Sequence, residues 1–281
     1  MRTKLSNKTR VLIHEALRED IGSGDITTKT LIPPSLHGTA YIQAKENGVL
    51  AGGEVVWEVF RAVDIKLKVQ QHVSDGGRVR KGEKVFSIRG RIASILKGER
   101  VALNFLSHLS GVATLTRRFV DRAKGTKAKI YDTRKTTPLW RELEKGAVKT
   151  GWGFNHRFGL WDQVLAKDNH WAALGKENGR AFQRLKKRGK FVEIEVRDLK
   201  ELVYVLPFKP DAVLLDNFSI PKLKIAVRIA AAFRNRPILE ASGGIHLANI
   251  SKIAKTGVDR ISVGALTHSA PAVDFSLELN Q

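Results

Sequence analysis

The sequence predicts an α/β protein with two parts: an N-terminal α/β sandwich of the hammerhead type and a C-terminal open α/β barrel of the TIM type. Three features of the chain support this prediction. Short β-like runs punctuated by glycine occupy residues 38–95, a long helical pattern covers 97–124, and strands then alternate with helices up to residue 263. Alternation at intervals of about 20–35 residues is typical of parallel strands joined by crossover helices.

The N-terminal part is predicted to begin with a helix at 6–20, because apolar residues recur there at helical spacing after the N-cap candidate Ser6. The segment Gly22-Ser23-Gly24-Asp25 superficially resembles a phosphate-binding loop. No strand precedes it and no helix clearly follows it, so we assign it no ligand. The β-like runs of this part lie at 38–44, 48–51, 65–69 and 84–88.

Six short apolar runs follow the long helix and are predicted to form the strands of the barrel. These strands are expected at 128–131, 163–166, 191–196, 212–215, 237–240 and 260–263, and the helices between them at 139–150, 176–187, 198–206, 220–234 and 247–256. We place the domain boundary near residue 113, which gives an N-terminal domain 1–113 and a barrel domain 114–269. The tail 270–281 is expected to return to the N-terminal domain.

Composition excludes several classes of protein. The 281 residues include no cysteine, which removes disulfides, thiolate catalysis and zinc–sulfur sites. No stretch has the length of apolar sequence that a membrane span needs, and the N-terminus lacks the apolar core of a signal peptide, so we expect a cytoplasmic enzyme. A formal net charge of +21 predicts attraction to anions, with nucleic acid as one candidate.

Polar and glycine-rich clusters follow the predicted barrel strands. In a parallel barrel these positions meet at the carboxyl-terminal rim, where active sites form. Ordinary capping explains single Asp or Ser residues but not this many cations. The candidate site residues are Thr133, Arg134, Lys135, His156, Arg157, Lys167, Glu195, Asp216, Ser242, Gly243, Gly244, Ser262, Val263 and Gly264.

The chemistry of these clusters indicates a pocket for a polyanion. Arg134 and Arg157 can pair bidentately with carboxylate or phosphate oxygens. Backbone amides in the glycine loops 242–244 and 262–264 can approach a phosphate closely. Glu195 and Asp216 could hold Mg²⁺ through its waters or accept hydrogen bonds from sugar hydroxyls, and salt bridges to neighbouring lysines are an equal alternative.

Several blocks of sequence resemble those of the quinolinate phosphoribosyltransferases. They include Asp-Thr-Arg-Lys-Thr-Thr-Pro at 132–138, Asn-His-Arg at 155–157, Lys-Asp-Asn-His at 167–170 and Glu-Ala-Ser-Gly-Gly-Ile at 240–245. The likeness begins at Glu-Asp-Ile-Gly-Ser-Gly-Asp-Ile-Thr-Thr, residues 19–28, and covers nearly the whole chain. The order and spacing of so many blocks make the resemblance specific.

The resemblance implies an enzyme of de novo NAD synthesis that converts quinolinate and phosphoribosyl pyrophosphate into nicotinate mononucleotide, pyrophosphate and carbon dioxide. It further implies Mg²⁺ as cofactor and a homodimer or dimer-based hexamer in which Arg100 reaches the quinolinate pocket of the partner subunit. Within the rim, it implies catalytic roles for Lys135, Lys167, Glu195 and Asp216, with the last two serving the ribose and the metal. No membrane and no specific nucleic acid are expected as partners.

The chain departs from the family pattern at four positions. Leu139 stands where the family commonly has glycine, Gly146 replaces an aromatic residue, Trp152 replaces the second glycine of a Cys-Gly-Gly segment, and Trp171 is bulkier than expected. None of these changes removes a charged group. They bear on the loop shape around Trp152 and on the affinity for quinolinate.

Two other functions would each explain part of the sequence. A phosphoribosyltransferase-like relative associated with molybdenum transport shares the fold and much of the motif set, but Arg100 together with Arg134, Arg157 and Lys167 favours the quinolinate enzyme. A basic nucleic-acid-binding protein would account for the net charge but not for the carboxylates and glycine loops at the rim.

Overall fold

The computed structural model describes residues 5–167, 169–170, 173, 181–182, 184–185 and 189–280. Internal contacts divide the chain into two compact units. The N-terminal unit comprises Met1–Arg117, Thr136–Trp152 and Thr267–Gln281, and the barrel unit comprises Arg118–Lys135 and Gly153–Leu266. The stretch 136–152, which the sequence placed in the barrel domain, therefore groups with the N-terminal unit. Units defined by contacts need not coincide with folding domains, so the boundary near residue 113 stays a prediction.

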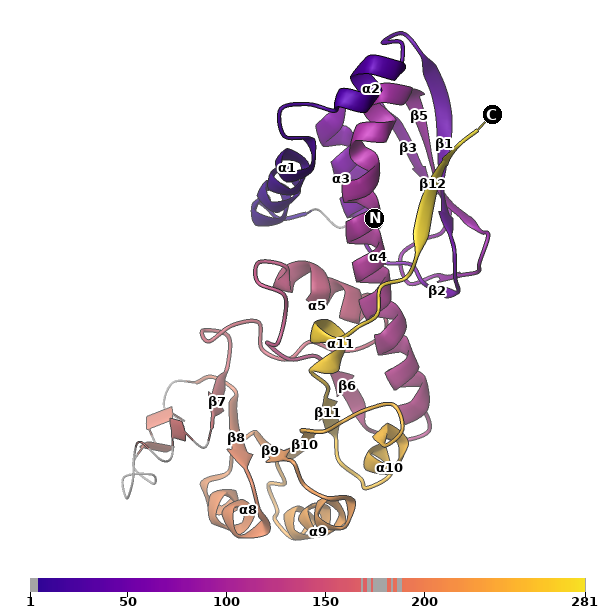
Figure 1. Ribbon diagram of the computed structural model, residues 1–281. Coiled ribbons are helices and arrows are strands. Elements are labelled where there is room, and N and C mark those ends of the chain that lie inside the picture. The colour runs from indigo at the N-terminus through magenta and orange to yellow at the C-terminus, as the bar shows by residue number, and fades with distance from the viewer. Residues whose placement is uncertain are drawn as a thin grey trace. The chain divides into compact units, whose positions relative to one another are not determined.

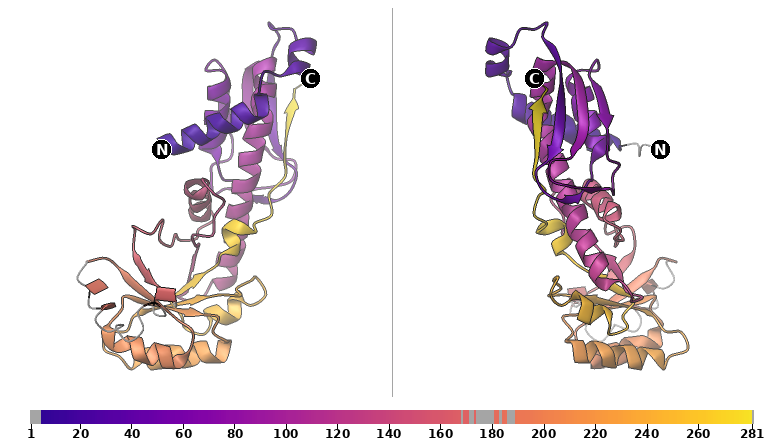
Figure 2. Two further views of the ribbon diagram at one scale, coloured as in Figure 1. Left: turned by 60° about the vertical axis from the view of Figure 1, so that its left-hand side comes forward. Right: turned by 90° about the vertical axis from the view of Figure 1, so that its right-hand side faces the viewer.

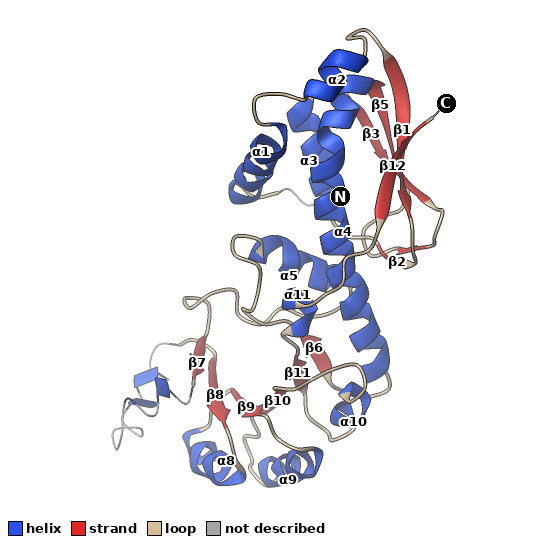
Figure 3. Cartoon of the chain, in the orientation of Figure 1, coloured by secondary structure: helices blue, strands red, loops and turns tan. Residues whose placement is uncertain are grey.

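The N-terminal unit is built on a four-stranded antiparallel sheet in the order β12-β1-β5-β3, with α3 and α4 on one face (Figures 1 and 3). The strands are β1 (His37–Ala44), β3 (Lys68–Gln71), β5 (Lys84–Arg91) and β12 (Phe275–Leu279), and β2 (Gly48–Val49) pairs with β4 (Arg78–Val79) in a separate ribbon. The helices are α1 (Asn7–Ile21), α2 (Ile26–Leu31), α3 (Gly53–Val63), the long α4 (Ile92–Ala123) and α5 (Arg141–Thr150). Strand β12 brings the end of the chain back beside β1, with Tyr41 opposite Glu278.

Helix α1 begins where the sequence indicates. The Ser6 side chain accepts a hydrogen bond from the Thr9 N–H, which satisfies one of the free amides of the first turn. Ile13 and Leu17 lie four residues apart on one face and are buried. The helix predicted at 6–20 from the Ser6 cap and the apolar spacing is thus confirmed.

Helices α2 and α3 were not predicted from the sequence. Asp25 caps α2 by accepting from the Thr28 N–H, so a short helix does follow the segment 22–25. Helix α3 is rich in valine, a β-branched residue with lowered helix propensity. Its buried residues Val55, Val56 and Val59 form one apolar face, and burial of that face outweighs the local preference.

The barrel unit contains a six-stranded parallel sheet in the order β6-β11-β10-β9-β8-β7, with α8 and α9 side by side on one face (Figures 1 and 2). All six predicted strands are confirmed. They are β6 (Lys129–Tyr131), β7 (Val164–Ala166), β8 (Val192–Val196), β9 (Ala212–Asp216), β10 (Ile238–Ser242) and β11 (Arg260–Ser262). The intervening helices are α8 (Leu199–Val205), the 3-10 turn η2 (Leu206–Phe208), α9 (Ile220–Ala231) and α10 (Ile250–Ala254), with α11 (Ala265–His268) after β11.

Two of the predictions fall outside the described residues. Most of the helix expected at 176–187 lies there, and so does Trp171. Among the residues that the structure does describe, no helix combines the length and apolar character needed to cross a lipid bilayer.

Two of the unusual residues adopt a backbone conformation that favours glycine. Leu139 has φ +67° and Trp152 has φ +71°, both in the left-handed region. These are the positions at which the resembling family has glycine. Leu139 is 86% exposed, so few packing contacts offset its backbone strain. Trp152 has a compensation, because the Arg117 guanidinium lies 4.4 Å from its ring centroid.

We expect Leu139→Gly to stabilise the protein by about 0.5–1 kcal/mol, because relief of left-handed strain exceeds the added entropy of the unfolded glycine. The measurement is the midpoint of urea unfolding. Leu139→Ala is the matched control: it removes the exposed side chain but keeps the Cβ that causes the strain, so it should give no gain. Equal stabilisation by both substitutions would contradict backbone strain as the cause.

Candidate active site

The parallel sheet brings the carboxyl ends of its strands to one edge. Ser242 lies level with Asp216 on the neighbouring strand, and Ser262 lies level with Tyr131. On β8, Glu193 and Glu195 alternate with buried valine and isoleucine residues and therefore share one face of the sheet. The side chains of this face and the loops beyond the strand ends form the candidate site.

Asp132 attaches a further segment to this edge. Its N–H donates to the Phe154 carbonyl, and its buried carboxylate accepts the N–H of His156 at 2.8 Å. The Phe154 N–H in turn donates to the Ile130 carbonyl. Residues 154–156 therefore run beside the end of β6, which places His156 and Arg157 at the rim.

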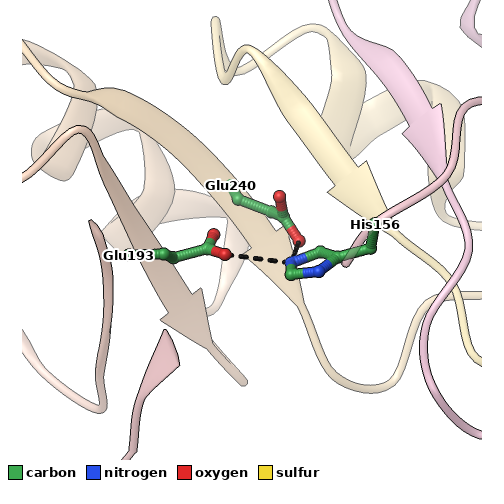
Figure 4. A group of neighbouring side chains, drawn as sticks. All are labelled: His156, Glu193 and Glu240. Atoms are coloured by element: carbon green, nitrogen blue, oxygen red, sulfur yellow. Dashed lines mark ion pairs between the residues drawn. The ribbon is translucent and has the colours of Figure 1, made fainter. Parts of the chain in front are cut away.

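The imidazole of His156 points towards two carboxyl groups on the strands (Figure 4). Its Nε2 lies 2.9 Å from Glu193 Oε2 and 3.5 Å from Glu240 Oε1, and both glutamates are completely buried. Its Nδ1 accepts the N–H of Arg157 at 2.7 Å, with the Gln163 amide 3.3 Å away. Because Nδ1 accepts this N–H, a ring proton on Nε2 faces Glu193.

This arrangement changes the interpretation of His156. From its position in the sequence, His156 was expected to bind substrate. In the structure it is 8% exposed, and both ring nitrogens are engaged within the protein. Its evident contribution is to hold the backbone of Arg157.

Glu240 holds a proton that an exposed glutamate would lose. Burial, together with the charge of the adjacent Glu193, raises the pKa of Glu240 from 4.5 to about 8. Two adjacent carboxyl groups without access to water cannot both carry charge cheaply. Glu240 is therefore protonated at neutral pH.

The same three side chains could in principle bind a metal ion, because their ligand atoms all lie within 4.8 Å of one another. The hydrogen bonds argue against it. A metal at Nε2 requires the ring proton on Nδ1, where the Arg157 N–H already donates. The geometry therefore fits a cluster of titratable side chains better than a metal site.

Arg157 and Arg134 supply positive charge above this cluster. Arg157 is 8% exposed, and burial lowers the pKa of its guanidinium, as does the nearby charge of Arg134. Glu193 and Glu195 act in the opposite direction on the same group. Two guanidinium groups close enough to repel each other form a site that an anion stabilises.

Lys167 and Glu195 form an ion pair of 2.8 Å, with Glu195 largely buried and Lys167 half exposed. The salt-bridge alternative considered for Glu195 is thus present in the structure. On the next strand, Asp216 Oδ2 accepts from the Asn217 side chain at 2.8 Å. Pairing of Glu193 with Ala212 and of Glu195 with Leu214 puts Glu195 and Asp216 on the same face of adjacent strands.

A glycine turn follows β10. The Asn217 N–H donates to the Ser242 carbonyl, and Gly243, at φ +87°, packs so closely on the Asn217 side chain that a Cβ would collide with it. Gly243 and Gly244 are exposed, and within the described part of the chain their N–H groups donate to no protein acceptor. These two amides are available to a phosphate, as predicted from the sequence.

The 262–264 loop differs from its prediction. The Val263 N–H donates to the Tyr131 carbonyl at 2.9 Å and is therefore not available to a phosphate. Ser262 is buried and lies beside Glu240. Val263 and Ser262 thus hold the sheet together, because the backbone pairing between β11 and β6 continues through the Val263 N–H to the end of the predicted strand 260–263.

The remaining predicted residues lie in different places. The Thr133 hydroxyl accepts the Lys135 N–H, which shapes the turn after β6, and the Lys135 side chain is exposed. Arg100 belongs to α4 of the N-terminal unit, and its side chain is 61% exposed. Asp132, Glu193 and Glu240 were not predicted as site residues. The signal that could have found the two glutamates is a carboxylate at alternate positions in otherwise apolar strands.

Known families provide an independent comparison. The model of the C-terminal domain of quinolinate phosphoribosyl transferase matches residues 112–278, and that of the N-terminal domain matches residues 25–110. The chain belongs to the quinolinate phosphoribosyltransferase family. This confirms the resemblance found in the sequence.

Relatives in this family align over almost the whole chain. A nicotinate-nucleotide pyrophosphorylase (carboxylating) of Mycobacterium leprae is 41% identical and covers 96% of both chains. A quinolinate phosphoribosyltransferase (decarboxylating) of Nicotiana tabacum is 40% identical over 94% of this chain and 80% of its own. The nicotinate-nucleotide pyrophosphorylase structures from Francisella tularensis and Ehrlichia chaffeensis superpose with TM-scores of 0.91 and 0.92 at 40% and 39% identity. They cover 99% of this chain and 98% and 100% of their own chains. The predicted two-part α/β fold is that of the quinolinate phosphoribosyltransferases.

The raised pKa of Glu240 predicts a pH dependence of stability in this family member. Between pH 4.5 and about 8 the folded protein keeps a proton that the unfolded chain releases, so stability falls as pH rises through this window. Glu240→Gln keeps a neutral group at this position and should therefore flatten that decline. The fall in melting temperature from pH 5 to pH 8 should be smaller in this variant than in the wild type by roughly 5 °C.

Thermal unfolding at several pH values measures this effect. Glu278→Gln is the matched control. Glu278 is exposed and its pKa is lowered by Lys45, so it is ionised throughout the window and its loss should leave the slope unchanged. Equal slopes for the wild type and Glu240→Gln would show that Glu240 does not hold the proton.

Proposed function

We propose that this chain transfers the phosphoribosyl group of phosphoribosyl pyrophosphate to quinolinate and removes one carboxylate. The products would be nicotinate mononucleotide, pyrophosphate and carbon dioxide, in NAD biosynthesis. The observation that carries the proposal is full-length identity of about 40% to relatives named for this activity. The rim chemistry supports it, because both substrates are multiply anionic and the rim gathers Arg134, Arg157 and Lys167.

The proposal divides the rim between the two substrates. Arg134, Arg157 and Lys135 would bind the quinolinate carboxylates. The exposed amides of Gly243 and Gly244 would bind the phosphate of the ribosyl donor. Lys167, which pairs with Glu195, would contribute a further positive charge to the bound anions.

Glu195 and Asp216 suit an indirect Mg²⁺ site. They share a face of adjacent strands, and in the described part of the chain one oxygen of each accepts from a neighbouring side chain, so that the other could accept from a metal-bound water. When bound, Mg²⁺ would neutralise the charge of the leaving pyrophosphate. Departure of pyrophosphate develops positive charge on the ribose ring, and the carboxylate of Glu195 would stabilise that charge.

The second half of the reaction needs no nucleophile from the protein. Once the pyridine nitrogen carries the ribosyl group, the ring withdraws electrons from the adjacent carbon, and the C–C bond to the carboxylate can break with its electron pair left on the ring. The arginines would hold the other carboxylate during this step. A chain without cysteine is consistent with such a mechanism.

Assembly and location belong to the same proposal. We expect a homodimer, or a hexamer built from dimers, in which the exposed Arg100 of one subunit enters the quinolinate pocket of the other. The location is proposed as cytoplasmic. The tobacco relatives with mitochondrial in their names show that location varies within the family.

The activity is tested by mixing pure protein with quinolinate, phosphoribosyl pyrophosphate and Mg²⁺ and measuring nicotinate mononucleotide. Lys167→Ala should lower kcat/KM by roughly 100-fold or more, as expected for loss of a charge at the reacting groups. Lys224→Ala, on the exposed side of α9, is the control and should retain activity. Absence of product from the wild type under all conditions would refute the proposal.

Mixing two inactive variants tests the shared site. Random exchange of Arg100→Ala and Lys167→Ala subunits makes half of the dimers mixed, and each mixed dimer has one intact site of two, so about a quarter of wild-type activity should return. Subunit exchange is verified by native mass spectrometry. If mixed dimers form and stay inactive, Arg100 does not act across the interface.

A further inference from the structure

The N-terminal unit contains a cationic hollow that the proposed reaction does not use. It has a volume of about 650 Å³ and lies at one end of the sheet formed by β1, β5 and β3. The polar side chains that line it are His37, Thr39, Lys66, Lys68, Arg89 and Arg91, together with Asp64.

The strand register forces like charges together in this hollow. Lys68 on β3 lies directly opposite Arg89 on β5, and both side chains are exposed. Like charges in directly opposed positions destabilise an antiparallel pair. Lysine on an edge strand such as β3 can serve to prevent aggregation. That explanation does not extend to Arg89, because β5 is an interior strand with a partner on each side.

Asp64 does not relieve this repulsion. Its Oδ2 accepts from Arg91 Nε and Nη2 at 3.1 and 2.7 Å and from Ser94 Oγ at 2.8 Å, and its Oδ1 accepts the Lys66 N–H. The hydrogen bonds from Arg91 are the main cause that lowers the pKa of Asp64 to about 2. This carboxylate therefore orients Arg91 at the wall of the hollow, and in the described part of the chain it forms no salt bridge with Lys66, Lys68 or Arg89.

Within the described ranges of the chain, no acidic side chain forms a salt bridge with Lys66, Lys68 or Arg89. Three uncompensated charges and one oriented guanidinium thus face a common space. A multiply charged anion in that space would remove the repulsion and gain charge-assisted hydrogen bonds.

The lining specifies the kind of anion. Apart from two glycines, all the residues that line the hollow are polar or charged, so a ligand that accepts hydrogen bonds from cations is favoured. The aromatic ring on the same face of β1, Tyr41, is covered by the Lys84 ammonium, 3.7 Å from its centroid. Binding of a nucleic-acid strand usually relies on exposed aromatic rings for stacking.

We propose that this hollow, referred to here as the sheet-end hollow, binds a chain of phosphate groups. The ligand would be free oligophosphate or the phosphate chain of a nucleotide, recognised through Lys66, Lys68, Arg89 and Arg91. The inference concerns the N-terminal unit alone and does not depend on the proposed reaction. Its ligand has two possible sources, which the experiment separates.

The experiment compares two double variants of the full-length protein. Lys68→Gln/Arg89→Gln removes two charges from the hollow. Lys45→Gln/Lys84→Gln is the matched control, because it removes two charges from the same sheet region outside the lining. Binding of inorganic tripolyphosphate is measured by calorimetry, and thermal unfolding is followed with and without it.

The hollow variant should bind tripolyphosphate at the sheet-end hollow about tenfold more weakly or worse, whereas the control should bind like the wild type. Without ligand, the hollow variant should melt at the same or a higher temperature than the wild type, because the opposed charges are gone. Unchanged affinity in the hollow variant, or equal loss in both variants, would overturn the proposal.

Further probes distinguish the ligand. Inorganic phosphate should bind far more weakly than tripolyphosphate. Equal affinities for tripolyphosphate and ATP would support recognition of the phosphate chain. ATP binding tenfold tighter, or a single-stranded oligonucleotide binding tighter than either, would contradict it. A higher KM for phosphoribosyl pyrophosphate in the hollow variant would assign the residues to an active site and overturn a separate binding site.

Discussion

The geometry of the site depends on the hydrogen bonds of Asp132 at the end of β6. A carboxylate with no exposed surface is costly to bury, and this cost is offset only because donors such as the His156 N–H are fixed around it. The same residue extends the backbone pairing between β6 and Phe154. A loop residue is thereby held with the precision of a strand residue. His156 in turn accepts the Arg157 N–H. The backbone of Arg157 is therefore fixed relative to the sheet, and this limits where its guanidinium can lie.

Charge in the barrel unit is arranged in two layers. One layer is the buried cluster of His156, Glu193 and Glu240, in which Glu240 is protonated at neutral pH. The other consists of the guanidinium groups of Arg157 and Arg134, which repel each other. Glu193 and Glu195 favour the charged form of Arg157. An apolar floor would raise the cost of collecting arginines there.

The strands and the cations were predictable because each rests on a local pattern. Apolar runs at regular intervals located all six barrel strands, and Arg134, Arg157 and Lys167 stood directly behind such runs or in a distinct polar block. Helix α3 was not predictable in this way, since its valines favour a strand and only packing against the rest of its unit makes it helical. The orientation of His156 and the use of the Val263 amide depend on register between strands far apart in sequence. Periodicity along one segment does not contain that information.

The destabilising features that remain in the fold are of two kinds. Neighbouring cations repel each other in Lys68 and Arg89 and in Arg134 and Arg157. An anion bound between two such cations would offset the repulsion, so the repulsion energy of the free protein would add to the free energy of binding. The left-handed backbone of Leu139 is different, because no ligand can change the collision of a Cβ with its own main chain. Strain of the first kind is relieved by a bound anion. Strain of the second kind is not relieved by a ligand. At the exposed Leu139, the loop has a backbone conformation that suits glycine better than leucine.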